Sequence, residues 1–274
     1  MDLLLSVFLG LALLVGLGWV GLQIPPKGFP PHPEKTQDLG TGKLPSGLPG
    51  PVRCYFEAAL GEEIPRIESA VLWGRGRLKV KGLWLPVRFR AYYLPGQAFR
   101  RLMEITWFGF PLLRGVDSYL DGRGKLEITG LISLSETGEK IDQAQNLVLW
   151  GEAIWTPSVY LTDPRVRWEA VDKKTARLVV PFGEGEEVFL VQFDPQTEMI
   201  QEMSAERYRG QEEAKTPWRV ECFDWKSFHG VMVPTRVVGT WADEKRPYVV
   251  MTVEGLEYNV DVSEVLPVGE APSS

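Results

Sequence analysis

Residues 142–155 read DQAQNLVLWGEAIW, and they interrupt a chain that otherwise has the texture of short strands. Asp142 with Gln145 three residues later resembles a capping box at a helix start. Pro157 disfavours helical geometry at Thr156, so the helix should end there. The apolar residues recur at helical spacing and form one stripe, which consists of Ala144, Leu147, Val148, Gly151, Ile154 and Trp155. The segment therefore predicts the best helix of the folded body.

The segments on both sides of this helix predict strands. Residues 69–80 (SAVLWGRGRLKV), 83–94 (LWLPVRFRAYYL) and 99–110 (FRRLMEITWFGF) alternate apolar with basic or polar residues, which is the period of a strand with one solvated face. Seven similar runs follow between residues 166 and 258 with short links. Tight turns are predicted at Asp121-Gly122, Thr137-Gly138, Asp194-Pro195 and His229-Gly230.

Such short links exclude parallel crossovers, which need a dozen or more residues. The strands are too polar to be buried on both faces, so one face must be covered. We therefore predict a mainly β (α+β) fold: a curved antiparallel meander sheet, or open half-barrel, covered by the 142–155 helix over an apolar hollow. A short helix at 52–60, ended by Gly61, is expected before it.

The N-terminus predicts a membrane segment. Residues 3–24 (LLLSVFLGLALLVGLGWVGLQI) carry no charge, and a bilayer core needs about 20 apolar residues in a helix. A cleaved signal peptide is the alternative, but neither a charged n-region nor a small-residue cleavage site is present. We predict an uncleaved, single-pass anchor at residues 1–24 in the cell membrane. Three lysines follow the segment (Lys27, Lys35 and Lys43), which by the positive-inside rule favours a cytoplasmic body.

The remaining boundaries follow from composition. Residues 25–51 are crowded with proline and glycine, which favour neither helix nor sheet, and they predict an extended tether with His32 exposed and unpartnered. Residues 52–262 form the predicted half-barrel domain, and 263–274 a flexible tail. The net charge of -6 and the lack of a basic run exclude nucleic-acid binding. Cys54 and Cys222 match no metal spacing; they predict two small buried side chains, with a long-range disulfide as the alternative.

Few residues could carry catalysis. No G-x-S-x-G, zinc spacing, phosphate loop or dinucleotide fingerprint is present, and His229 sits at a predicted hairpin turn. We predict no catalytic residue, metal or cofactor. Glu152 with Asp117 or Glu169 is the one carboxylate pair worth considering as acid and base. Burial beside tryptophan would raise the pKa of Glu152, yet a structural hydrogen-bond acceptor is the favoured interpretation, ahead of a ligand-contacting group and a catalyst.

The aromatic surplus suggests a lined cavity. Ten tryptophans are present, and on the concave face of a half-barrel such side chains can surround an apolar ligand instead of filling the core. Arg88, Arg90, Arg100 and Arg101 could meet a headgroup, although such residues more often lie on a solvated face. The predicted ligand-binding set is Trp84, Trp107, Phe110, Tyr119, Trp150, Glu152, Trp155, Trp168, Trp218 and Trp241.

Several motifs in order resemble a known family. They are the E-x-x-W-x-P of Glu152, Trp155 and Pro157, the V-x-W-E of Val166, Trp168 and Glu169, the P-W of Pro217-Trp218, and the G-x-x-x-P of Gly230 and Pro234 followed by Trp241. Over residues 50–260 the chain resembles an uncharacterised family of bacterial membrane-anchored proteins, which is similar to the lipoprotein-carrier (LolA-like) superfamily. The resemblance implies an open half-barrel closed by helices over an apolar cavity, with the body outside the cytoplasm. Members often carry a basic residue one turn before the glutamate, where this chain has Val148.

We therefore expect a membrane-tethered protein that holds a lipid or other apolar ligand. An envelope structural or assembly protein with a filled core, acting through an unknown protein partner, is the alternative. A carboxylate-dependent hydrolase or isomerase is the third.

Overall fold

Thirteen antiparallel strands form the main sheet of the computed structural model, which describes residues 2–244 and 246–267. The strands are β3 (Ala70–Val80), β4 (Leu83–Leu94), β5 (Ala98–Trp107), β6 (Phe110–Leu120), β7 (Arg123–Gly130), β8 (Leu134–Glu136), β9 (Arg167–Ala170), β10 (Thr175–Phe182), β11 (Gly185–Phe193), β12 (Ile200–Tyr208), β13 (Lys215–Phe228), β14 (Val231–Trp241) and β15 (Pro247–Tyr258). The predicted mainly β class is confirmed.

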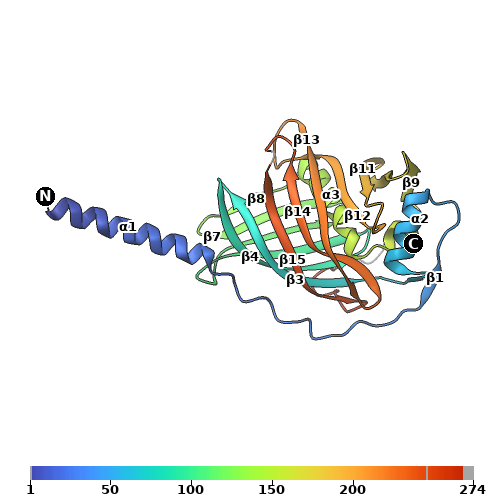
Figure 1. The fold of residues 1–274 in the computed structure, drawn as a ribbon, viewed down its shortest axis with the longest axis horizontal. Coiled ribbons are helices and arrows are strands. Elements are labelled where there is room, and N and C mark those ends of the chain that lie inside the picture. Colours follow the sequence, from blue (N-terminus) through green and yellow to red (C-terminus); the bar gives the residue numbers. More distant parts are fainter. Residues whose placement is uncertain (1, 245, 268–274) are drawn as a thin grey trace.

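Two meanders make up this sheet, and they meet in its middle. Strands β3 to β8 run outward to one edge, and β9 to β15 return from the opposite edge until β15 pairs with β3. The predicted antiparallel meander is confirmed, with this one pairing between segments that are distant in sequence. The edge strands β8 and β9 do not pair with each other, so the sheet stays open (Figure 1).

The sheet is curved, and the β3–β15 junction carries features that permit bending. The backbones approach so closely there that a Cβ added to Gly74 would lie 2.0 Å from the carbonyl oxygen of Thr252. A β-bulge interrupts β15 between Val253 and Gly255. Glycines and bulges let a sheet curve, and the two halves of the sheet cross steeply in Figure 1. The predicted open half-barrel is confirmed.

Helices lie at the ends and on the inner face of the sheet. They are α1 (Asp2–Gln23), α2 (Gly50–Leu60), α3 (Glu139–Glu152) and α4 (Val159–Thr162), with a 3-10 turn, η1 (Ala153–Trp155), directly after α3. Helix α2 confirms the short helix expected at 52–60, and Gly61 ends it. Helix α3 packs against β6, β7, β10 and β12, so it covers the concave face as predicted.

The start of α3 differs from the prediction. The helix begins at Glu139 after Gly138, and no side chain caps it, so the capping box is absent. The Asp142 carboxylate instead accepts hydrogen bonds from the Gly124 backbone N–H at 2.7 Å and from Arg123 at 3.0 Å. Asp142 therefore fixes the helix to β7, because a carboxylate satisfies buried backbone donors wherever they lie.

Three of the four predicted turns close hairpins. Asp121-Gly122 and His229-Gly230 have positive φ at both residues and link β6 to β7 and β13 to β14. Asp194-Pro195 lies between β11 and β12. Thr137-Gly138 closes no hairpin, because it leads from β8 into α3, so the turn predicted there is wrong.

Helix α1 projects away from the sheet as a single rod (Figure 1). Its segment Leu4–Gln23 spans 20 residues with a mean hydropathy of 2.2 and is almost entirely exposed. Among the described residues it is the one helix long and apolar enough to cross a membrane, a test that a signal sequence also meets.

The proline-rich segment after α1 is held against the outer face of the sheet. Carbonyl oxygens of Pro26, Lys27 and Pro30 accept hydrogen bonds from arginines on β3 and β4. Proline lacks an N–H but keeps its acceptor, so guanidinium donors can fix such a segment. The expectation of a segment without sheet is wrong at β1 (Thr41–Lys43), which pairs with β2 (Glu63–Pro65).

His32 is less exposed than predicted, because its side chain is half-buried. Both ring nitrogens are enclosed and have no hydrogen-bond partner among the described residues, as predicted. Burial lowers the pKa of His32 below its usual value. The reason is again the docking of this segment, which removes the imidazole from water.

The core continues past residue 262. Leu266 is buried with Val71, Trp73 and Val260 on the outer side of the sheet. Residues 263–267 therefore belong to the packed body, and the rest of the predicted flexible tail, 268–274, lies outside the described residues. Cys54 is half-buried and Cys222 buried, and both are free thiols. The interpretation of two small buried side chains fits this arrangement better than a disulfide.

Candidate ligand cavity

A cavity of 380 Å³ lies between α3 and the concave face of the sheet. Its walls are mainly aliphatic, with residues such as Met103, Leu113 and Met251 from the strands and Ile154 from η1. Strand alternation explains the lining: on β6 the residues at 113, 115 and 117 all face inward. The other part of the concave face is filled by aromatic rings around α2. The hollow predicted under the helix is therefore real but partial.

Four side chains form a closed polar cluster at the cavity wall. Arg101 of β5 bonds the Glu152 carboxylate through one terminal nitrogen, and its Nε lies 3.1 Å from Oδ1 of Asp117. The Tyr93 hydroxyl donates to the other oxygen of Glu152 at 2.6 Å. The three charged side chains are 11–13 % exposed. Glu152 therefore connects the C-terminal end of α3 to β4 and β5.

The pKa shifts in this cluster follow from burial and pairing. Burial raises the pKa of Glu152, and the Arg101 guanidinium and Tyr93 hydroxyl lower it in part. Burial would lower the pKa of Arg101, but the carboxylates of Asp117 and Glu152 outweigh it, so the pKa is raised. The guanidinium is thus charged at any physiological pH and saturated by two carboxylates.

Arg207 differs from Arg101 in its partners. Its guanidinium lines the cavity and packs against two indole rings, with its carbon 4.9 Å from the Trp218 ring centroid and 5.4 Å from that of Trp241. Its Nε donates to the carbonyl of Ala144 at 3.0 Å. No carboxylate of the described residues lies within 4.0 Å of it, and burial lowers its pKa. Arg207 therefore brings to the wall of an apolar cavity a positive charge that has no direct carboxylate partner.

Gln145 adds a polar group that has an unused hydrogen-bond acceptor. Its side chain is 5 % exposed and lines the cavity from α3, and its buried Oε1 has no hydrogen-bond partner in the described structure. A buried amide without partners is costly. Together with Arg207 it gives the cavity hydrogen-bonding capacity that the protein itself leaves unused.

Comparison with known proteins assigns a family. Residues 40–252 match the family of unknown function DUF6544. The chain belongs to DUF6544. A search of the curated proteins finds no match.

Two solved structures resemble this DUF6544 protein. One is a LolA superfamily protein from Nitrosomonas europaea, with a TM-score of 0.49 and 9% identity over 79% of this chain and 95% of that one. The other is a DUF1329 family protein from Desulfovibrio piger, with a TM-score of 0.42 and 12% identity over 78% and 92% of the two chains. The prediction of a family of unknown function is confirmed.

The predicted ligand-binding residues are only partly brought together. Glu152, Trp155 and Trp218 line the cavity, and Trp241 supports it by stacking on Tyr248. Three of the predicted residues are buried or half-buried away from the cavity: Tyr119, Trp150 and Trp168. Two others, Trp107 and Phe110, are exposed at a hairpin.

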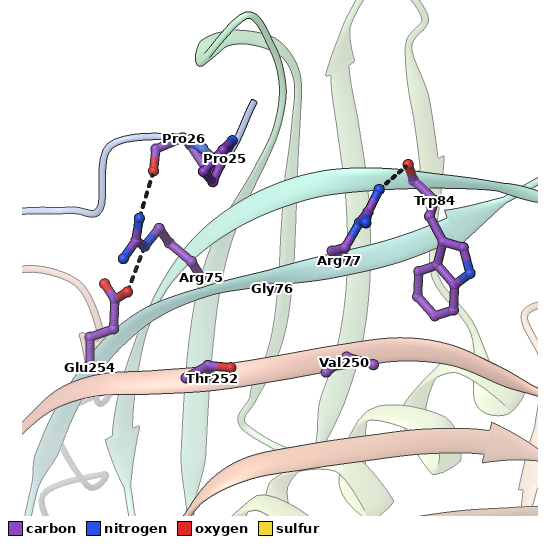
Figure 2. A pocket seen from close by; sticks show the side chains of 9 residues that line it. All are labelled: Pro25, Pro26, Arg75, Gly76, Arg77, Trp84, Val250, Thr252 and Glu254. Atoms are coloured by element: carbon purple, nitrogen blue, oxygen red, sulfur yellow. Dashed lines mark hydrogen bonds and ion pairs between the residues drawn. The ribbon is translucent and has the colours of Figure 1, made fainter. Parts of the chain in front are cut away.

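Trp84 lies on the opposite face of the sheet. It lines an open groove of 510 Å³ between the docked proline segment and strands β3 and β15 (Figure 2). Arg75 crosses the end of this groove, where it bonds Glu254 and the carbonyl of Pro26. Trp84 therefore cannot contact a ligand in the inner cavity.

Of the groups considered for catalysis, Glu152 and Asp117 meet at Arg101, whereas Glu169 and His229 lie elsewhere. Glu169 on β9 pairs with Arg167 and Arg177 at the surface, whereas Glu152 lines the cavity. His229, at its hairpin turn, lies 3.0 Å from the carbonyl of Leu256. Among the described residues no group of three His, Cys, Asp or Glu could hold a metal ion.

In this DUF6544 protein Arg207 was missed from the sequence, and Arg101 was considered only as a headgroup contact or a solvated residue, not as the buried partner of Asp117 and Glu152. Arg207 shares its strand face with Met203 and Ala205, and Arg101 shares one with Phe99. Their position on the apolar face of an alternating strand was the available signal. Val148 stands where members of the family often carry a basic residue. The structure replaces that partner, because the basic residue that pairs with Glu152 is Arg101 of β5.

Proposed function

We propose that this protein binds an apolar chain with an anionic head in the cavity beneath α3, close to a membrane in which α1 anchors it. The observation that carries the proposal is Arg207, a half-buried arginine whose guanidinium faces an apolar cavity and has no carboxylate partner among the described residues. An isolated buried charge is costly in an apolar environment unless it is paired. An anionic ligand supplies that pair.

The size of the cavity favours a ligand with one acyl chain. Ligand pockets usually measure about 300–1,000 Å³, and 380 Å³ lies near the lower end. The walls supply apolar burial, worth about 0.8 kcal/mol for each methylene removed from water. We therefore expect a single acyl chain or a molecule of similar size to fit, and a diacyl lipid to enter with one chain only.

The head group should lie between Arg207 and Gln145. A guanidinium binds carboxylate or phosphate oxygens through charge-assisted, often bidentate hydrogen bonds. The Gln145 amide provides a further donor and acceptor. Arg101 is unsuited to this role, because Asp117 and Glu152 already occupy its donors.

The alternatives fit less well. An assembly protein with a filled core would have no use for a cavity that holds an unsatisfied amide oxygen and a guanidinium without a carboxylate partner. A carboxylate-dependent enzyme would need Glu152 or Asp117 free to exchange protons with a substrate, yet both are bonded to Arg101. Glu152 serves better as the group that orients the end of α3 over the sheet.

Ligand uptake by the delipidated full chain, held in an amphipathic polymer, tests the proposal. Dansylaminoundecanoic acid has both a chain and a carboxylate, and its fluorescence should rise on binding. Arg207→Met should weaken binding about 10–100-fold, because hydrogen bonds to charged groups contribute roughly 1.5–3 kcal/mol. Arg219→Met is the matched control, since Arg219 lies on β13 beside Trp218 but is exposed.

The results separate the possibilities. Uptake by wild type and Arg219→Met, with loss in Arg207→Met, supports the proposal. No uptake by the wild type, or equal uptake by all three, refutes it. An amide analogue of the probe that binds as well as the acid would refute the anionic head.

The location of the domain is part of the proposal. We place α1 in the cell membrane as a single-pass anchor and the half-barrel outside the cytoplasm. Protease added to intact spheroplasts should digest the domain; digestion confined to lysed cells would contradict this placement.

A further inference from the structure

Three hairpins carry a cluster of exposed apolar side chains at one end of the sheet. Phe110 is 75% exposed, Leu131 72% and Ile132 56%. We define the apolar rim as Val80, Leu83, Trp107, Phe110, Leu131 and Ile132. Apart from Leu39, Val171 and Leu190, every exposed large hydrophobic side chain found after Ile24 in the described residues lies on these three hairpins. Contiguous exposed apolar surface marks an interaction site.

The rim borders the cavity. Val80 and Ile132 belong both to the exposed apolar set and to the cavity lining. A ligand entering between the β3–β4 and β7–β8 hairpins would therefore pass the rim before it reaches Arg207.

The rim is also joined to α1. The Trp107 indole donates to the carbonyl of Gly18 at 3.1 Å, and the Phe108 backbone N–H donates to the carbonyl of Gly21 at 2.9 Å. Gly21 leaves no room for a side chain, because an added Cβ would lie 2.3 Å from the Trp107 ring. Figure 1 shows α1 leaving the body at this end of the sheet. The position of the helix therefore fixes the position of the rim.

The geometry points to a lipid bilayer as the surface that covers the rim, so that the cavity mouth faces the membrane. The 20 residues of Leu4–Gln23 are about 30 Å long as a helix, which matches a hydrocarbon core. Gly18 is five residues from the helix end, or about 8 Å, so its Trp107 partner lies near the interface, where tryptophan is favoured. The inference rests on the proposed anchoring by α1 and goes beyond it, because the hairpins themselves enter the lipid.

The opposite end of β6 provides a control. Strand β6 has 11 residues and is therefore roughly 35 Å long. Phe110 begins it at the rim, whereas Gly122 follows it at the far turn and borders the same depression as the exposed Glu184. Glu184 should stay in water when Phe110 is in lipid.

Nitroxide labels on the full chain test the inference without any ligand. Phe110→Cys, Leu131→Cys and Glu184→Cys are made singly in a Cys54→Ser background, since Cys222 is buried, and reconstituted into vesicles of phosphatidylcholine with one quarter phosphatidylglycerol. Collisions with oxygen should exceed those with a water-soluble nickel chelate at 110 and 131, and the order should reverse at 184. Dominant nickel collisions at 110 and 131 overturn the inference, and so does shielding from both reagents, which would indicate a protein partner or a second copy.

A transfer assay links the rim to binding. The Phe110→Asp/Leu131→Asp protein should bind the dansyl probe added from solution as the wild type does, but take it from vesicles at least tenfold more slowly. Equal rates from vesicles overturn the inference. If the wild type binds no probe at all, the proposed function fails. The collision measurements on the nitroxide labels still test whether the rim enters the bilayer.

Discussion

Replacing Arg101 by methionine should destabilise the domain strongly. The substitution keeps an apolar stem of similar length but leaves Asp117 and Glu152 facing each other without a cation, although each is only 11–13 % exposed. Removing one partner of a buried ion pair costs about 3–5 kcal/mol. For a chain of this size the melting temperature should fall by about 6–20 °C. Chemical unfolding of the full chain in mild detergent, followed by tryptophan fluorescence, measures the change.

The stability that Arg101→Met loses should depend on pH. Without the guanidinium, burial raises the pKa of Glu152 further, because Arg101 is the main influence that lowers it now. A carboxyl whose folded-state pKa exceeds its unfolded value of about 4.3 binds protons more tightly when folded, so stability falls as pH rises through that interval. The difference in the free energy of unfolding between Arg101→Met and the wild type should therefore be small at pH 4 and should reach the whole expected loss at pH 7.5.

A surface arginine provides the control. Arg167 also bonds two carboxylates, Glu169 and Glu186, but all three side chains are well exposed. Arg167→Met should unfold close to the wild type, since solvent screens exposed pairs. If Arg101→Met were no less stable than Arg167→Met at pH 7.5, the cluster would not hold α3 in the way described.

Three further outcomes are expected. Glu152→Gln should keep the fold and the uptake of the dansyl probe, because the amide oxygen can still accept from Tyr93; a more than tenfold loss of uptake would show a direct role in binding. Gly115→Leu should block uptake without lowering the melting temperature, since its Cβ would meet only carbonyl oxygens at 3.8 Å and 3.9 Å and its side chain enters the cavity; undiminished uptake would place the ligand elsewhere. Without reductant, a thiol reagent should modify Cys54 in the folded protein and Cys222 only after denaturation, whereas a denatured chain with no reactive thiol would reveal a disulfide.

Local signals in the sequence were sufficient for the architecture. Strand alternation, short links and the 142–155 stripe predicted an open antiparallel sheet under a helix, because each depends on neighbouring residues. The β15–β3 pairing and the docking of the proline segment depend on residues far apart in the chain, and no local pattern indicates them.

The site was harder to predict for a related reason. Tryptophan content indicated buried surface but not which side of the sheet each ring occupies, so Trp84 was assigned to the wrong face. Glu152 was recognised as a structural acceptor, but its partner Arg101 comes from another strand. Arg207 could have been found from the alternation of β12, where it follows the buried Met203 and Ala205 on the same face.

The meeting of the two meanders constrains biogenesis. Strand β3 can pair with β15 only after all the strands between them in sequence have been synthesised, since Leu78 pairs with Val249. Until then β3 and β14 each present an unpaired edge, the kind of surface that recruits other chains. Non-local pairing of this kind is slow, and α1 leaves the ribosome before any strand of the sheet. With α1 anchoring the chain as proposed, the incomplete domain would need chaperone protection at the membrane until β15 pairs with β3.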